Sequence, residues 1–135
     1  MDAAKCRKLK QELLDQPEPQ VVPIERFFDG NDDLGSIGCN LTEHPGIEAF
    51  RNIFRTLAQR PDVEAIYAQI SELDPGDDYW PFTDTVLVAG TISADELRSI
   101  VARLQPDEVG RGAELGAPKS ILQLHGNQVL AVWWD

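Results

Sequence analysis

The chain has 135 residues, and 23 acidic side chains against 12 basic ones give a formal net charge of −11. A protein with this negative charge repels phosphate backbones, which argues against nucleic-acid binding and favours a cationic protein partner or a metal ion. A hydrophobic content of 42% is ordinary for a globular protein and is enough for one domain with a core of its own.

The amino terminus carries basic residues, but no apolar run follows them, so no secretory signal is predicted. No stretch approaches the roughly 20 apolar residues of a membrane span. The cysteines, Cys6 and Cys39, are expected to be free thiols in a reducing cytoplasm, with a disulfide between them as the alternative. The sequence therefore predicts a cytoplasmic protein without membrane association.

Residues 2–15 predict a short amphipathic helix, because Cys6, Leu9 and Leu13 follow helical spacing. The prolines of residues 16–20 end this helix and force an extended linker, so residues 1–20 are expected to precede a single α+β domain spanning 21–135. Residues 21–29 come next, and we expect a short helix there, with a short strand as the competing interpretation.

The middle of the chain alternates between strand and helix patterns. Residues 36–41 alternate apolar and polar side chains and predict a strand, and residues 47–59 carry the apolar stripe of a helix. Residues 63–73 fit either a helix or a strand; we prefer a strand because good turn sequences flank the segment. The β-branched residues 85–91 predict another strand.

Ser93 and Glu96 have the spacing of a capping box, which predicts a helix running to Leu104. Residues 107–119 then contain three glycines and a proline and are expected to form a loop. Residues 121–125 and 128–134 flank the pair Gly126-Asn127, which is typical of a two-residue turn in a β-hairpin.

This order predicts a ferredoxin-like βαββαβ antiparallel sheet, with an N-terminal helical extension and an extra C-terminal hairpin strand. Along residues 128–134 both faces are apolar, and Trp133 and Trp134 must point to opposite faces. The face away from the helices therefore needs a cover. We expect residues 21–28 to supply it with help from the first helix, and a homodimer through that face is the alternative to a monomer.

The acidic stretch around Asp29, Asn31 and Asp33 has its oxygen-bearing side chains at alternate positions, as the first ligands of an EF-hand loop do. The match then fails, because Leu34 stands where glycine is needed and Asn40 where a glutamate is needed. We therefore expect these side chains to bond to backbone amides of a turn, with no metal and no cofactor. A calcium site and an anionic surface for a partner are the alternatives.

Cys39 and His44 would form a nucleophile–base pair only if they met and a third group such as Glu43 or Asp84 oriented the histidine. Cys39 falls inside a predicted strand, where a thiol usually packs as a small apolar group. Residues 74–84 form a second acidic loop, with aromatic residues inside it and no base. It is expected to be a hairpin whose aromatic side chains fold over the edge of the core, or else a surface for an Arg- or Lys-bearing partner.

In the predicted topology, Glu43 and His44 share one end of the sheet with the second acidic loop, whereas residues 29–33 lie at the other end. The candidate partner-binding residues are Glu43, His44, Asp77, Asp78, Tyr79, Trp80 and Asp84. No residue is predicted to be catalytic.

The stretches GNDDLGSIGCNL, HPG, WPFTDTV and a closing VWWD resemble a family of uncharacterised small bacterial proteins, over about residues 24–135. The resemblance implies a bacterial cytoplasmic domain and assigns no activity to any residue. From its charge, we expect a non-enzymatic binding module for a basic protein partner, by analogy with toxin-immunity proteins. The alternative is a small-molecule or metal-dependent enzyme with an acidic cluster around His44. RNA-recognition domains share the predicted fold, but their basic aromatic strand motif is absent here.

Overall fold

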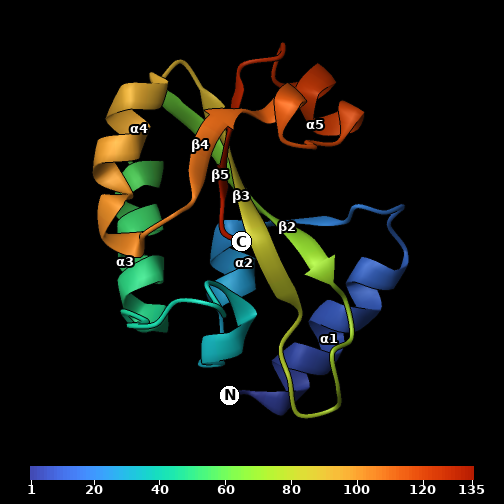
Figure 1. Cartoon of the computed structure of the whole chain (residues 1–135). Coiled ribbons are helices and arrows are strands. Elements are labelled where there is room, and N and C mark those ends of the chain that lie inside the picture. The colour runs from blue at the N-terminus through green and yellow to red at the C-terminus, as the bar shows by residue number, and fades with distance from the viewer.

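A five-stranded antiparallel sheet with the strand order β1-β2-β3-β5-β4 runs through the molecule (Figure 1). The computed structural model describes residues 1–135. The strands are β1 (Val21–Pro23), β2 (Val63–Glu72), β3 (Phe82–Gly90), β4 (Glu108–Arg111) and β5 (Val129–Trp133). The helices are α1 (Ala3–Leu14), α2 (Ile24–Phe28), α3 (Ile47–Ala58), α4 (Ala94–Ile100) and α5 (Lys119–Leu124), with 3-10 turns η1 (Leu34–Ser36), η2 (Ala102–Leu104) and η3 (Gly112–Glu114). No helix has the length and apolar character that crossing a membrane requires.

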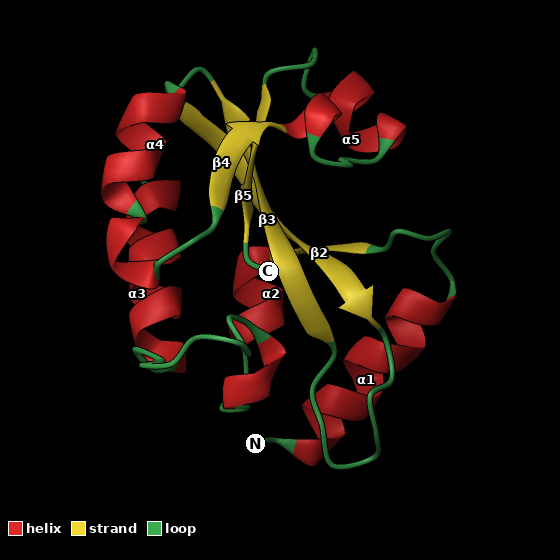
Figure 2. Ribbon diagram, in the orientation of Figure 1, coloured by secondary structure: helices red, strands yellow, loops and turns green.

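The two faces of the sheet are buried to very different extents. A cluster of 26 buried residues includes side chains from α1, α2, α3 and α4, whereas a second cluster of five includes one from α5. Figure 2 shows α3 and α4 on one side of the strands and α5 on the other. Side chains alternate along β2 and β3, so Ala68 and its partner Val86 belong to the large cluster, and Leu87 belongs to the small one. The large cluster therefore forms the main core.

Several predicted elements are present where the sequence patterns place them. The first helix, α3 and the strands β2 and β3 are confirmed, and α4 begins at the predicted capping serine. The Ser93 hydroxyl accepts a hydrogen bond from the Glu96 backbone amide at 3.1 Å. Residues 21–29 form both the expected short helix and the competing short strand, because β1 leads directly into α2.

The predicted strand at residues 36–41 is wrong. Residues 34–36 form the turn η1, and Ile37 makes only an isolated parallel bridge to Thr83. The Asp33 side chain accepts a hydrogen bond from the Gly35 amide, and Ser36 donates to the Asp33 carbonyl. These local bonds compete with ladder hydrogen bonds, and the positive φ of 65° at Gly38 ends any extended run.

The predicted hairpin around Gly126-Asn127 is also wrong, because residues 119–124 form the helix α5. The Asn127 amide donates to the Leu122 carbonyl and the Gly126 amide to the Gln123 carbonyl. This pair of bonds, with a φ of 61° at Gly126, is the Schellman arrangement that ends a helix. Both residues have the positive φ that the hairpin turn requires, so the local signal fits a helix end equally well.

The expected loop at residues 107–119 contains the edge strand β4, which pairs with β5. The ferredoxin-like arrangement is not confirmed: the structure is α+β with an antiparallel sheet, but its strand order differs. The expected cover of the second face is wrong as well. Phe27 and Phe28 lie in the main core, and the second face is packed by the η3–α5 segment through Leu115, Ile121 and Leu122.

Candidate functional site

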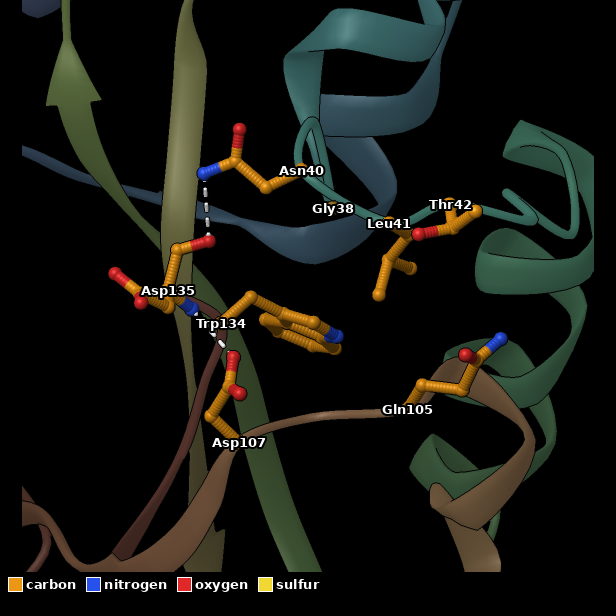
Figure 3. Close-up of a pocket in the computed structure, with 8 residues that line it drawn as sticks. All are labelled: Gly38, Asn40, Leu41, Thr42, Gln105, Asp107, Trp134 and Asp135. Atoms are coloured by element: carbon orange, nitrogen blue, oxygen red, sulfur yellow. Dashed lines mark hydrogen bonds between the residues drawn. The ribbon is translucent and has the colours of Figure 1, made fainter.

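Three stretches that are distant in the sequence meet around one groove of about 370 Å³ (Figure 3). A smaller pocket of about 160 Å³ shares four of its lining residues. We call the two together the acidic groove. Its lining is Gly38, Cys39, Asn40, Leu41, Thr42, Ser71, Phe82, Thr83, Asp84, Gln105, Asp107, Trp134 and Asp135. The groove thus joins the loop before α3, the start of β3, the loop after η2 and the residues after β5.

His44 holds the loop before α3 in place. Its Nε2 lies 2.7 Å from the Ile37 carbonyl oxygen, and its Nδ1 accepts a hydrogen bond from the Gly46 amide at 2.9 Å. Since a carbonyl can only accept and an amide can only donate, these two bonds require the neutral tautomer with the proton on Nε2. The ring packs on Phe50, with centroids 5.2 Å apart, and Phe50 packs on Trp134 at 5.7 Å. His44 is therefore a structural residue beneath the groove.

Trp134 and Asp135 tie the walls of the groove together. The Trp134 amide donates to the Asp84 carbonyl at 2.9 Å, and its indole Nε1 donates to the Leu104 carbonyl at 2.8 Å. The Asp135 amide donates to the Asp107 carboxylate at 2.6 Å, and the Asn40 side chain donates to the Asp135 carbonyl at 2.9 Å, as Figure 3 shows. The ring of Trp134 is buried, so the groove is built directly on the main core.

The charge of the groove is one-sided. Asp84, Asp107 and Asp135 are exposed, and none of their side chains lies within 4 Å of a basic group. Elsewhere, eight of the twelve basic side chains are paired with acids: Lys5, Lys10, Arg26, Arg51, Arg55, Arg60, Arg98 and Arg111. The lining contains no lysine, arginine or histidine. The groove therefore offers acceptor oxygens whose charge no side chain of the protein balances.

Two of the predicted partner-binding residues lie at the groove. Asp84 lines it, and Glu43 is exposed at its rim, where the Glu43 carbonyl accepts a hydrogen bond from the Gln105 side chain at 3.4 Å. The sequence interpretation missed Asp107 and Asp135. The signals for them were weak: Asp135 closes the VWWD stretch, and Asp107 follows a proline at the start of an expected loop.

Apart from His44, the other predicted residues lie in the β2–β3 loop, which α1 holds in position. Lys10 donates from Nζ to the Gly76 carbonyl at 2.8 Å, and the Cys6 thiol donates to the Tyr79 carbonyl at 3.4 Å. Asp77, Asp78 and Tyr79 are exposed on this loop. Trp80 is fully buried in the core, so it is not available to a partner. Tyr79 packs edge-on against Phe82 at 6.5 Å, which links the loop to the groove wall.

The acidic stretch 29–33 is engaged in the fold. Asp33 accepts hydrogen bonds from the Gly35 amide at 2.9 Å and the Trp80 amide at 3.0 Å, and Asn31 accepts one from the Asp33 amide. Asp29 pairs with Lys5 at 2.8 Å, and this bond lowers the pKa of the Asp29 carboxyl. The bond to Trp80 also places this stretch beside the β2–β3 loop, so the prediction that the two lie at opposite ends of the sheet is wrong.

The two cysteines have different surroundings, and neither forms a disulfide. Cys6 is buried in the core, and this burial raises the pKa of its thiol. Cys39 is exposed and lines the groove. Both ring nitrogens of His44 are bonded to backbone groups, so no Cys39–His44 catalytic pair is formed. No group of three or more His, Cys, Asp or Glu side chains converges as metal ligands would.

The model of the uncharacterized protein YfbO family matches residues 4–132. The chain belongs to this family. An Escherichia coli (strain K12) protein described as "Uncharacterized protein YfbO" is 30% identical to it over 123 residues, which cover 90% of this chain and 86% of that protein. No solved structure matches the chain. The predicted resemblance to an uncharacterised bacterial family is thus confirmed at the level of the family.

Proposed function

We propose that this protein is a non-enzymatic binding module whose acidic groove receives a basic segment of a partner protein. One observation carries the proposal: the carboxylates of Asp84, Asp107 and Asp135 share a groove in which no basic side chain balances them. Most basic side chains elsewhere are already paired within the chain. A cationic group of a partner should therefore be attracted more strongly to the groove than to the rest of the surface.

The chemistry of the lining suits lysine and arginine side chains. Asp107 uses one carboxylate oxygen to accept from the Asp135 amide, and its second oxygen has no partner in the chain. Gln105 donates one amide hydrogen to the Glu43 carbonyl, and its side-chain oxygen has no partner in the chain. Ammonium and guanidinium groups are pure donors, so they match a lining of acceptors. The net charge of −11 would also attract a basic partner from a distance.

An enzyme acting on a small molecule or with a metal has less support. Such a mechanism around His44 would need a free ring nitrogen, and both nitrogens are committed to the Ile37 carbonyl and the Gly46 amide. The exposed residues of the β2–β3 loop, Asp77, Asp78 and Tyr79, extend the acidic surface and are proposed as secondary contacts for the same partner.

The proposal is tested with a fluorescent peptide of alternating arginine and glycine, whose binding is followed by anisotropy at low salt. The test variant carries Asp84→Asn, Asp107→Asn and Asp135→Asn. A matched control, Asp15→Asn, Asp95→Asn and Glu114→Gln, removes the same charge from exposed positions outside the groove. We expect the groove variant to bind at least about tenfold more weakly, a loss of about 1.4 kcal/mol, and the control to stay within about twofold.

Equal weakening in both variants would show that only the net charge attracts the peptide, and the proposal would then be wrong. A pull-down from a bacterial lysate provides the second test. A stoichiometric basic protein captured by the wild type but not by the groove variant supports the proposal. A co-purifying metal or metabolite would favour the enzyme instead.

A further inference from the structure

A second depression lies outside the acidic groove, beside α2 and α3. It has a volume of about 430 Å³ and is lined by Pro23, Glu25, Arg26, Asp29 and Arg51. Two arginines and two carboxylates therefore face the same space, and what it can bind depends on which of these groups already have partners.

Both carboxylates are already neutralised by bases outside the lining. Glu25 receives two bonds from Arg55, at 3.0 Å and 3.1 Å, and Asp29 receives one from Lys5 at 2.8 Å. These contacts lower the pKa values of the Glu25 and Asp29 carboxyls, and Arg51 acts on both in the same direction. Both carboxylates that face the depression are thus balanced by bases from other elements.

The two guanidinium groups, in contrast, are poorly satisfied. Arg51 makes one long bond to Glu25, at 3.4 Å, and its Nε is buried without any acceptor in the chain. Arg26 makes one bond, to Glu12 at 2.9 Å. Only 24% of the Arg51 side chain and 26% of the Arg26 side chain are exposed, so solvent does not fully replace the missing acceptors. A guanidinium has five N–H donors, so one bond within the chain leaves most donors of each group without an acceptor.

The local charge also differs from that of the rest of the chain. The connected side chains comprise four cations, Lys5, Arg26, Arg51 and Arg55, and three anions, Glu12, Glu25 and Asp29. Glu48 also acts on Arg55, which brings the balance to neutral. In a chain of net charge −11, this neutral surface repels an anion less than its surroundings do.

We propose that this depression binds a phosphate group held by Arg26 and Arg51. Phosphate offers three or four oxygens in different directions, so guanidinium groups from two different helices can each take a pair of them. A single phosphate is expected rather than a nucleic acid, because a polyanion would extend over the acidic surface around the depression.

The test uses the side-chain Nε–Hε signals of arginine in a proton–nitrogen correlation spectrum of the whole protein. Inorganic phosphate is added at constant ionic strength, with chloride as the balancing anion. We expect the Arg51 and Arg26 signals to shift saturably. In Arg51→Gln, the phosphate affinity that the Arg26 signal reports should fall at least tenfold. Arg51→Lys keeps the positive charge but loses the planar guanidinium with its paired N–H donors, so it should bind phosphate with intermediate affinity.

Arg103→Gln is the matched control, because Arg103 is exposed, unpaired and outside the depression, and its loss should leave the titration unchanged. Phenyl phosphate and acetate distinguish the ligand class: phenyl phosphate should bind like phosphate, and acetate should bind much more weakly. Shifts that grow linearly without saturation, that persist in Arg51→Gln, or that are equal for acetate would each overturn the proposal. Backbone signals of Arg51→Gln show whether it keeps the fold.

Discussion

The stretch 29–33 and the acidic groove have similar chemistry but different consequences. In the first, Asp29 is bound by Lys5, and Asp33 is bound by the backbone amides of Gly35 and Trp80. In the second, three carboxylates have no basic partner within the protein. Composition alone would rank the denser stretch first as a binding site. We propose the opposite order, because carboxylates that already accept bonds within the fold have few free acceptors for a ligand.

The largest effect is expected when the stretch 29–33 is disturbed. Asp33→Ala removes a charged acceptor from two backbone amides, those of Gly35 and Trp80. The free energy of unfolding should fall by about 2 to 3 kcal/mol, since hydrogen bonds to charged groups are worth more than neutral ones. Urea denaturation measures this loss. Binding of the basic peptide by the folded fraction should not change.

Asp32→Ala is the matched control, because this neighbouring side chain is 76% exposed and pairs only with the terminal amino group of Met1. It should cost less than about 1 kcal/mol, as surface ion pairs do. If the two variants were equally stable, the stretch would not be structural, and the contrast with the groove would fail.

Replacing His44 tests whether this residue beneath the groove is structural or takes part in binding the peptide. In His44→Asn, the side-chain oxygen can still accept from the Gly46 amide, but the bond to the Ile37 carbonyl is lost. We expect a loss of about 1 to 1.5 kcal/mol in the free energy of unfolding, from one buried hydrogen bond. Peptide binding should remain within about twofold. Abolished binding in a fully folded variant would instead make His44 part of the interaction.

The sequence predicts the fold best where local and tertiary forces agree. The helix α4 follows from its capping box, and α3 from its apolar stripe, because each pattern has only one good structural solution. Gly126-Asn127 has two solutions, a hairpin turn and a helix end, and the packing of Ile121 against the second face decides between them. The short edge strand β4 has no pattern of its own and forms through its pairing with β5.

The candidate site is predictable only in part, for a related reason. Asp84 could be named because it sits in an acidic, aromatic stretch. Asp107 and Asp135 could not, since each stands alone in the sequence and joins the groove through the bond between the Asp107 carboxylate and the Asp135 amide. Trp80 was also a candidate for partner binding, but its ring is buried, which agrees with the expectation that the aromatic side chains of this loop fold over the core.

The paired carboxylates make stability depend on pH, because pairing changes their pKa values on folding. Binding by Arg55 and Lys5 lowers the pKa values of Glu25 and Asp29 below their ordinary values of 4.5 and 3.8. Because folding lowers these pKa values, the stabilising contribution of the two groups is fully present above 4.5 and 3.8, and it is lost as the pH falls from those values through the lower pKa values of the folded state. Urea midpoints at pH 6 and pH 3.5 should show this decline. Glu25→Gln should lose less between the two pH values than the wild type, and a variant that declined equally would show that the pair contributes nothing.

The smallest change, and one of opposite sign, is expected in the groove itself. Replacing Asp84, Asp107 and Asp135 by asparagine removes like charges that no base balances, so each change should leave the free energy of unfolding within about 0.5 kcal/mol or raise it slightly. The difference in the free energy of unfolding between wild type and variant should be larger when the basic peptide is present. At ten times its dissociation constant, a ligand that binds only the folded state adds about 1.4 kcal/mol of stability. The wild type should gain this amount, and the triple variant, which we expect to bind at least about tenfold more weakly, should gain about 0.4 kcal/mol or less. If both proteins gained equally, the peptide would bind elsewhere, and the distinction between engaged and unpaired acids would not locate the site.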